Sequence, residues 1–292
     1  MSTVQPGILA LGSSHHSYLM WDLVDGVDER QAVQRLLEVA AAAGSPASTL
    51  VVVGFRPELW DRLGEQGIDG LTGFNEPVVG DDGFTMPATQ HDAVVWIQSS
   101  SRDAVFDRGM GILQALDGLF QLVDCTDGWV YCRNKDLTGF VDGTENPAIT
   151  EAPGIVAGDT GNSVLLIQRW PHKARRWTSL PTGEQEKVIG RTKGGDEELD
   201  PQVETSHVAR TDQEDHGDIL RRNTAYGDVA LHGTMFVGFA SSKDPMQSML
   251  ESMAGKGCPR DALTRYSSVE TGGYYLIPSA ERIAQELPED DD

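Results

Sequence analysis

The chain has 292 residues, of which 39% are hydrophobic and 23% are charged, and its formal net charge at pH 7 is −22. That length can bury a large core in one large or two modest domains, and the composition excludes disordered and fibrous proteins. The negative charge argues against nucleic acids and anionic membrane surfaces as partners. No apolar run of about 18 residues and no signal peptide is present, so we expect a cytoplasmic protein without a membrane span.

The first half of the chain alternates strand and helix patterns. In chain order the patterns predict a strand at 17–23, an amphipathic helix over 28–43 ending at Gly44, strands at 49–55 and 93–98, a helix over 102–120 and a strand at 128–132. This order is typical of a ferredoxin-like unit, in which an antiparallel sheet carries helices on one face.

The second half repeats this order more loosely. The predicted elements are a strand at 163–170, a helix over 182–191 with a capping box formed by Thr182 and Gln185, a strand at 234–240, a helix over 245–254 and a strand at 273–277. We therefore predict an α+β fold of two tandem ferredoxin-like halves with antiparallel sheets. The predicted halves are residues 1–138 and 139–292, with an acidic tail from about residue 286.

The three cysteines are Cys125, Cys132 and Cys258. No Cys-x-x-Cys motif is present, which disfavours a zinc ribbon and a haem attached through thioethers. Cys125 and Cys132 could face each other across a hairpin, but in a reducing cytosol we expect free thiols.

The joint between the halves contains the most informative segment, Gly139–Pro147, with the sequence GFVDGTENP. An Asp-Gly pair alone indicates a turn. These nine residues, however, resemble the Gly-x-x-Asp-Gly signature loop of the dye-decolorising peroxidases. The chain is similar to the shorter bacterial branch of that haem-peroxidase family from Gln5 to Tyr275. The resemblance implies one non-covalent haem b per chain, in the C-terminal half near the joint, and a homo-oligomer.

His207 is the candidate iron ligand among the seven histidines. Its segment, Glu204–Arg210, is similar to the family segment that carries the proximal histidine. A peroxidase needs an electron-rich proximal histidine, and a carboxylate that accepts the other ring N–H makes it so. Asp261 is the candidate for that carboxylate. The alternative for Asp261 is an acid that stabilises a helix N-terminus.

Peroxide chemistry also needs groups on the opposite face of the haem. The resemblance makes Asp142 the distal acid, which moves a proton between the peroxide oxygens, and Arg221 the cation that stabilises developing negative charge. We expect Arg221 to lower the pKa of Asp142. Asn223 would lie on the same side of a strand as Arg221 and position peroxide or water. The alternative for Asp142 and Arg221 is a salt bridge between the halves.

Other residues are expected to contact the haem through the same resemblance. The backbone of Gly143, Thr144 and Glu145 should approach the porphyrin. Arg191 should bind the propionates, because its fork matches carboxylates, or else be a cation at a helix C-terminus. Strand residues that wall the porphyrin, or belong to ordinary core, are Met235, Phe236 and Phe239.

The predicted function is that of a haem b peroxidase that reduces hydrogen peroxide and oxidises small aromatic or dye-like reductants. The candidates to carry electrons to the surface are Trp170, Trp177, Tyr226 and Tyr266, though each is also consistent with plain packing. One alternative is a haem-handling protein that binds or transfers haem or releases its iron. Another is a non-catalytic cargo or sensor. A distal acid and arginine would be surplus in both alternatives.

Overall fold

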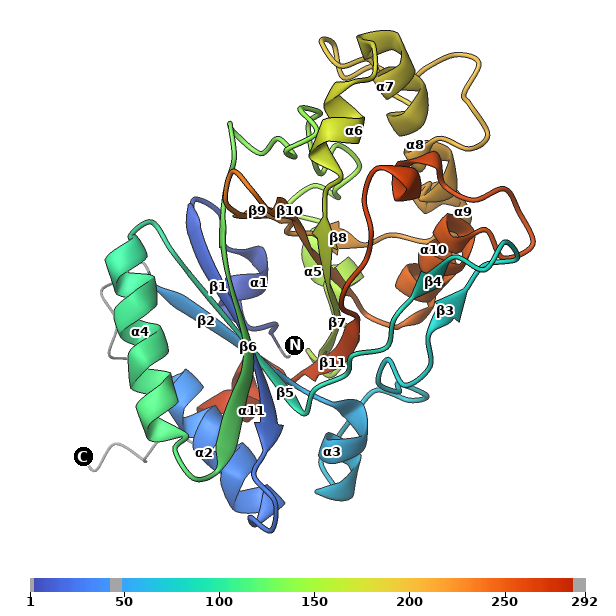
Figure 1. Ribbon diagram of the computed structural model, residues 1–292. Helices are drawn as coiled ribbons and strands as arrows, with labels where there is room; N and C mark the ends of the chain where they lie inside the picture. Colours follow the sequence, from blue (N-terminus) through green and yellow to red (C-terminus); the bar gives the residue numbers. More distant parts are fainter. Residues whose placement is uncertain (1–2, 43–48, 286–292) are drawn as a thin grey trace.

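The computed structural model describes residues 3–42 and 49–285 and has the predicted α+β class (Figure 1). The strands are β1 (His15–Leu23), β2 (Leu50–Phe55), β3 (Val78–Val79), β4 (Thr85–Met86), β5 (Ala93–Ser99), β6 (Phe120–Trp129), β7 (Ser163–Pro171), β8 (Leu220–Arg221), β9 (Thr224–Gly227), β10 (His232–Ala240) and β11 (Gly273–Ile277). The helices are α1 (Pro6–Leu9), α2 (Glu29–Ala41), α3 (Pro57–Arg62), α4 (Arg102–Ala115), α5 (Ala152–Val156), α6 (Ala174–Thr178), α7 (Thr182–Ile189), α8 (His207–Arg210), α9 (Gln213–His216), α10 (Asp244–Ala254), α11 (Ala280–Ala284) and the 3₁₀ turn η1 (Ala262–Arg265).

The strands of both halves join in one antiparallel sheet. Its nine strands follow the order β7-β11-β2-β5-β1-β6-β9-β10-β8, and β7 also pairs with β10, so the sheet closes on itself. The joints between the halves are short, because β6 meets β9 only through Gly128 and Trp129, and β11 meets β2 through Leu276 and Phe55. The halves therefore face each other across the inside of this closed sheet.

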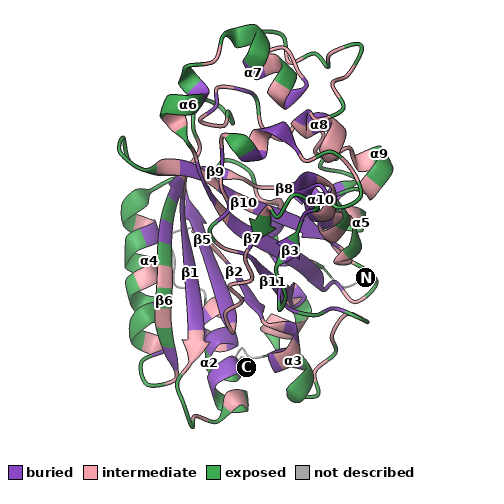
Figure 2. Ribbon diagram, turned by 45° about the vertical axis from the view of Figure 1, so that its right-hand side comes forward, coloured by how far each residue is buried: buried purple, intermediate pink, exposed green. Residues whose placement is uncertain are grey.

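Two large hydrophobic clusters follow from the alternation of side chains along the strands. The inner cluster lies inside the closed sheet and includes Tyr18, Trp96, Phe239 and Tyr275. The outer cluster includes strand residues on the other face together with α2, α4 and α10. Figure 2 shows the buried strands beside the half-exposed helix α4. Both clusters agree with the period-2 alternation of apolar residues along the strands.

Most long predicted elements are confirmed, and β11 has the predicted bounds. The helix predicted over 102–120 is too long, because α4 ends at Ala115 and β6 already begins at Phe120. Gly118 lies in the connecting turn with φ +74°, a left-handed conformation that favours glycine and ends the helix. The helix predicted to end at Gly44 stops at Ala41, and Gly44 lies outside the described residues.

The capping box predicted at Thr182 and Gln185 is wrong. The N-cap of α7 is Pro181, which has no side-chain capping bond. Gln185 is buried instead, donating from Nε2 to the Trp177 carbonyl at 3.0 Å and accepting from Lys193 Nζ at 2.7 Å. The three cysteines are free, as expected. No helix in the described ranges is long and apolar enough to cross a membrane.

Candidate functional site

A cavity lies on the outer face of the C-terminal strands, beneath α8 and α10. It encloses about 1240 Å³ of empty space, counting the part that opens to solvent. Its apolar wall comes from alternate strand residues and from one side of α10: Leu166, Trp170, Phe236, Met246, Met249, Leu250 and Met253. Phe236 thus lines the cavity, whereas Met235 and Phe239 point to the inner cluster.

The loop after β6 brings the signature segment to the cavity. The Asp142 N–H donates to the Asn134 carbonyl at 2.9 Å, and Asn134 Nδ2 donates to the Asp142 carbonyl at 2.8 Å. Gly143 has φ +75°, and a Cβ there would lie 2.8 Å from Asn146 Nδ2. Glycine therefore allows the chain to turn directly after the acid.

Asn146 ties this loop to β8. Its Nδ2 donates to the Arg221 carbonyl at 2.9 Å, and its Oδ1 accepts from the Arg221 N–H at 2.8 Å. This two-bond contact brings Asp142 and Arg221, which are far apart in the sequence, to the same end of the cavity. Asn146 belongs to the signature segment, but the sequence alone did not predict this role.

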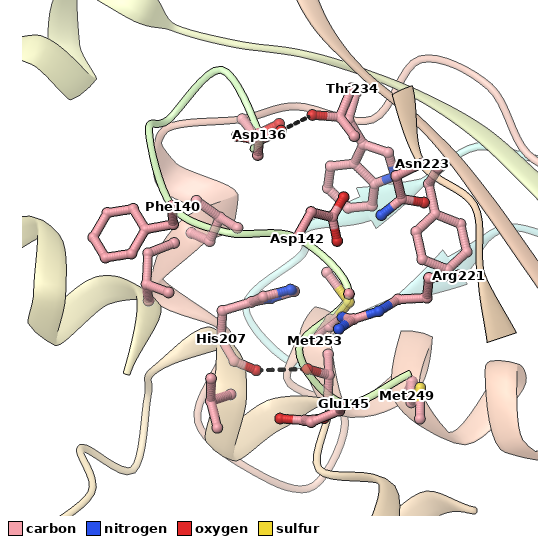
Figure 3. A pocket seen from close by; sticks show the side chains of 18 of the residues that line it. Asp136, Phe140, Asp142, Glu145, His207, Arg221, Asn223, Thr234, Met249 and Met253 are labelled. Atoms are coloured by element: carbon pink, nitrogen blue, oxygen red, sulfur yellow. Dashed lines mark hydrogen bonds between the residues drawn. The ribbon is translucent and has the colours of Figure 1, made fainter. Parts of the chain in front are cut away.

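Asp142, Arg221 and Asn223 converge on the cavity (Figure 3). In the part of the chain that the structure describes, no hydrogen bond or ion pair joins Asp142 to Arg221, and Arg221 Nε is buried without a hydrogen-bond partner. Asn223 Oδ1 accepts from the Val237 N–H at 2.9 Å, which fixes its side chain. The alternative of a structural salt bridge between Asp142 and Arg221 is therefore wrong.

The expected direction of the Asp142 pKa is also wrong. Burial raises the pKa of Asp142 above its ordinary value, and the charge of Asp136 adds to this effect. Arg221, Asn223 and His207 lower the pKa but only partly offset the burial. Arg221 acts in the expected sense, but the desolvation of Asp142 could not be read from the sequence.

His207 begins α8 and extends its ring toward Asp142 across the cavity (Figure 3). Its Nδ1 lies 2.7 Å from Asp261 Oδ2, and the Asp261 side chain is fully buried. Burial alone would lower the pKa of His207, but the Asp261 carboxylate raises it above the ordinary value. Nε2 therefore remains free of this contact and available to a ligand.

Both alternatives for Asp261 are present in one side chain. While Oδ2 contacts His207, Oδ1 accepts from the Leu263 N–H at 2.8 Å and caps η1. The cap fixes the carboxylate, and the carboxylate in turn orients the imidazole ring. The two interpretations that the sequence left open do not compete.

The other predicted residues also reach the cavity. Gly143, Thr144, Glu145 and Arg191 line it. Arg191 pairs with Glu145 at 3.4 Å and with Glu198 at 2.5 Å. Its Nε is buried and has no hydrogen-bond partner among the described residues.

The four aromatic candidates for electron transfer lie at different distances from the cavity. Trp170 lines it, and Phe140, also in its wall, contacts Trp177 edge-on with the ring centroids 6.1 Å apart. Trp177 contacts Tyr266 in the same way at 5.5 Å. Tyr226 belongs to the inner cluster, away from the cavity.

Among the polar cavity residues that sequence reasoning missed are Asp136, His172 and Thr234. Asp136 stands six residues before Asp142, and its Asp-x-Thr-Gly context gives the signal of an ordinary turn. His172 and Thr234 reach the cavity only because β7 and β10 are neighbours in the sheet. No local pattern marks either of them. The methionines of α10, in contrast, recur at helical spacing and could have been found.

The donor set fits a haem. A haem iron needs one protein nitrogen on its proximal side, and His207, oriented by Asp261, offers Nε2. A porphyrin needs apolar walls, which β7, β10 and α10 supply. Its propionates need a cation, and Arg191 lines the cavity and has a buried Nε–H without a partner among the described residues.

Comparison with known proteins agrees with this chemistry. Residues 14–130 match the family description "Dyp-type peroxidase, N-terminal", and residues 133–282 match "Dyp-type peroxidase, C-terminal". The chain is 34% identical over 275 residues to a dye-decolorizing peroxidase of Rhodococcus erythropolis, covering 88% of this chain and 79% of that protein. A second such relative, from Mycobacterium tuberculosis, is 33% identical over 257 residues, covering 82% and 76%.

Solved structures have the same fold. A dye-decolorizing peroxidase from Bacteroides thetaiotaomicron superposes with a TM-score of 0.88 at 27% identity, covering 98% of each chain. A variant of DypB from Rhodococcus jostii RHA1, solved in complex with haem, superposes with a TM-score of 0.86 at 31% identity, covering 96% of this chain and 97% of that one.

Proposed function

The chain belongs to the dye-decolorising peroxidase family, haem-dependent enzymes that reduce hydrogen peroxide and oxidise a second substrate, and we propose that the cavity beneath α8 and α10 is its active site. The observation that carries the proposal is that His207, Asp142 and Arg221 face one apolar-walled cavity from three separate segments. His207 Nε2 would ligate the iron of a haem bound in this cavity. Arg191 would bind its propionates, and the backbone of Gly143–Glu145 would approach the porphyrin.

When bound, the haem supplies the redox chemistry that reduces peroxide and draws electrons from the second substrate. Asp261 accepts the Nδ1 proton of His207, which keeps Nε2 unprotonated and makes the ligand electron-rich. On the opposite side, Asp142 accepts a proton from one peroxide oxygen and returns it to the other, which leaves as water. Its raised pKa suits this role, because a more basic carboxylate is a better proton acceptor.

Arg221 stabilises the negative charge that develops on the departing oxygen. The preorganised guanidinium has no carboxylate partner to compete with peroxide within the described chain. Asn223, held by the Val237 N–H, positions the peroxide beside Asp142.

The alternative, a haem-handling protein, is not favoured. Haem transfer or iron release needs no acid and cation opposite the ligand, and burying such groups in a carrier would cost stability without a use. Cytoplasmic residence, a homo-oligomer and a division at residue 138 stay predictions. The three free thiols support a reducing compartment.

The test is stopped-flow mixing of the haem-loaded enzyme with hydrogen peroxide. Asp142→Asn should slow the first spectral change by about 10²–10⁴ and Arg221→Leu by about 10²–10³, with the double variant losing less than the product because both groups act on one step. Arg102→Leu, which removes a cation whose side chain is 78% exposed, is the control and should react at the wild-type rate. Wild-type rates in both active-site variants would refute the assignment.

A further inference from the structure

The cavity contains a second carboxylate, Asp136, close to Asp142 (Figure 3). Three groups hold it: the Thr138 N–H donates to Oδ1 at 2.7 Å, the Thr234 hydroxyl donates to Oδ2, and His172 Nε2 lies 3.8 Å from Oδ2. His172 Nε2 also lies 3.0 Å from Thr234 Oγ1. The imidazole, the hydroxyl and the carboxylate thus form a continuous polar chain.

Both carboxylates line one small polar pocket. It encloses about 230 Å³ of empty space and has room for about one water molecule. Asp136, Asp142, Asn223 and Thr234 line it, together with the exposed residues Asn134 and Lys135. A water there would have polar partners on several sides and a path to solvent.

The surroundings shift the pKa values of the two carboxylates in opposite directions. Although burial alone would raise the pKa of Asp136, His172 and the hydrogen bonds from Thr138 and Thr234 lower it below the ordinary value. The pKa of Asp142 is raised, as described above, by burial and by the charge of Asp136. Neighbouring acids with separated pKa values commonly divide a fixed-charge role from a proton-carrying one.

We propose that Asp136 is a positioning residue for proton transfer: held as an anion by Thr138, Thr234 and His172, it faces Asp142 across a water-sized pocket and makes Asp142 the carboxylate that carries the proton. This inference rests on the proposed role of Asp142. The peroxide O–H bond breaks as an O–H bond forms on Asp142, and the same proton then passes to the departing oxygen. Asp136 neither gains nor loses a proton, and a water in the pocket would let Asp142 equilibrate with solvent between turnovers.

The charged groups around this pair come from several elements. Asp142 faces Arg221 of β8 and His207 of α8, besides Asp136. Asp136 faces His172 at the end of β7, and the His232 ring lies 6.3 Å from that of His172. Lys135, which is exposed, also lines the pocket. Removing the Asp136 charge changes only one of these interactions with Asp142. Because that charge raises the pKa of Asp142, its removal should lower this pKa.

The test is Asp136→Asn in the haem-loaded enzyme, since asparagine keeps the side-chain shape, with one oxygen that can accept from the Thr138 N–H and an NH₂ group that can donate to the Thr234 hydroxyl oxygen. Infrared difference spectra against pH follow the carboxyl band of protonated Asp142, identified by its loss in Asp142→Asn. In Asp136→Asn the midpoint of this band should move to lower pH by about 1 unit, because a like charge is gone. The acid limb of the peroxide reaction should move with it.

Asp124→Asn is the matched control, because it removes a carboxylate that pairs with Arg169 at 3.0 Å outside the cavity. It should leave the midpoint in place. If Asp136→Asn does not fold, Thr234→Val removes one donor to Asp136 and should move the midpoint in the same direction by less. An unmoved midpoint in the folded Asp136 variant, or in Thr234→Val in its place, overturns the inference.

The two proposals fail separately. If Asp142→Asn slows the peroxide reaction but Asp136→Asn leaves the midpoint unchanged, Asp142 keeps its role and Asp136 has none in the transfer. If Asp142→Asn reacts at the wild-type rate, the proposed function of Asp142 fails, and the inference about Asp136 fails with it.

Discussion

Replacing Asp261 with asparagine tests whether its carboxylate sets the protonation and orientation of the His207 ring. Asp261 Oδ1 caps η1 through the Leu263 N–H, and Oδ2 lies 2.7 Å from His207 Nδ1. An asparagine that keeps the cap places its NH₂ group against Nδ1. That group donates, so Nδ1 must accept, and the imidazole proton moves to Nε2, the atom that should bind iron.

The magnitude follows from the burial of this contact. Asp261 is fully buried, so a hydrogen bond to a charged group, worth about 1.5–3 kcal/mol, is lost without compensation by water. That free energy corresponds to a decrease in haem affinity of about 10–100-fold. The loss of the carboxylate should also raise the reduction potential of the haem iron, because the ligand becomes less electron-rich.

Haem titration of the apoprotein, followed by absorption, measures the affinity, and spectroelectrochemistry measures the potential. Asp28→Asn is the matched control, because Asp28 caps α2 by accepting from the Gln31 N–H at 3.1 Å and contacts no histidine in the described structure. Haem affinity and potential in Asp261→Asn equal to the wild type would show that Asp261 is only a helix cap.

Two further predictions concern charge. Haem affinity should decrease on acidification, because only the neutral His207 ring binds iron. The midpoint should lie above the ordinary histidine pKa of about 6.5, because Asp261 raises the pKa of His207. Haem titrations across pH test this, and a midpoint below about 6.5 would contradict it. The net charge of −22 should lower kcat/KM for anionic dyes and raise it for cationic ones. Both effects should diminish as salt shortens the screening length to about 10 Å at 0.1 M. Rates that do not depend on ionic strength would show that the acidic surface serves only solubility.

Hydrophobic periodicity predicted most of the long elements of this fold. Strands such as β11 and helices such as α10 carry their pattern within a few residues, so a local reading finds them. The end of α4 was missed because the helical apolar spacing continues through Leu116, whereas the Gly118 turn ends the helix there. The closure of the sheet through β7 and β10 is a tertiary contact that no local pattern encodes.

The candidate site also has some features that the sequence predicts and others that depend on the fold. Asp142, His207 and Arg221 were found because each stands in a segment that resembles a known family, and the structure brings all three to one cavity. The sign of the Asp142 pKa could not be predicted, because burial outweighs the charge of Arg221 and depends on the whole fold. Asp136 was missed because Thr234, which holds it, is 98 residues away in the chain.

The central claim is that His207 holds the haem iron in this cavity, and the absorption spectrum of haem-loaded His207→Ala tests it most directly. His216→Ala is the control, because His216 is on neighbouring α9 and contacts Ser248 Oγ at 2.7 Å. We predict that His207→Ala loses haem or shows a changed spectrum that added imidazole restores, while His216→Ala keeps the wild-type spectrum. Full haem occupancy with an unchanged spectrum in His207→Ala would contradict it.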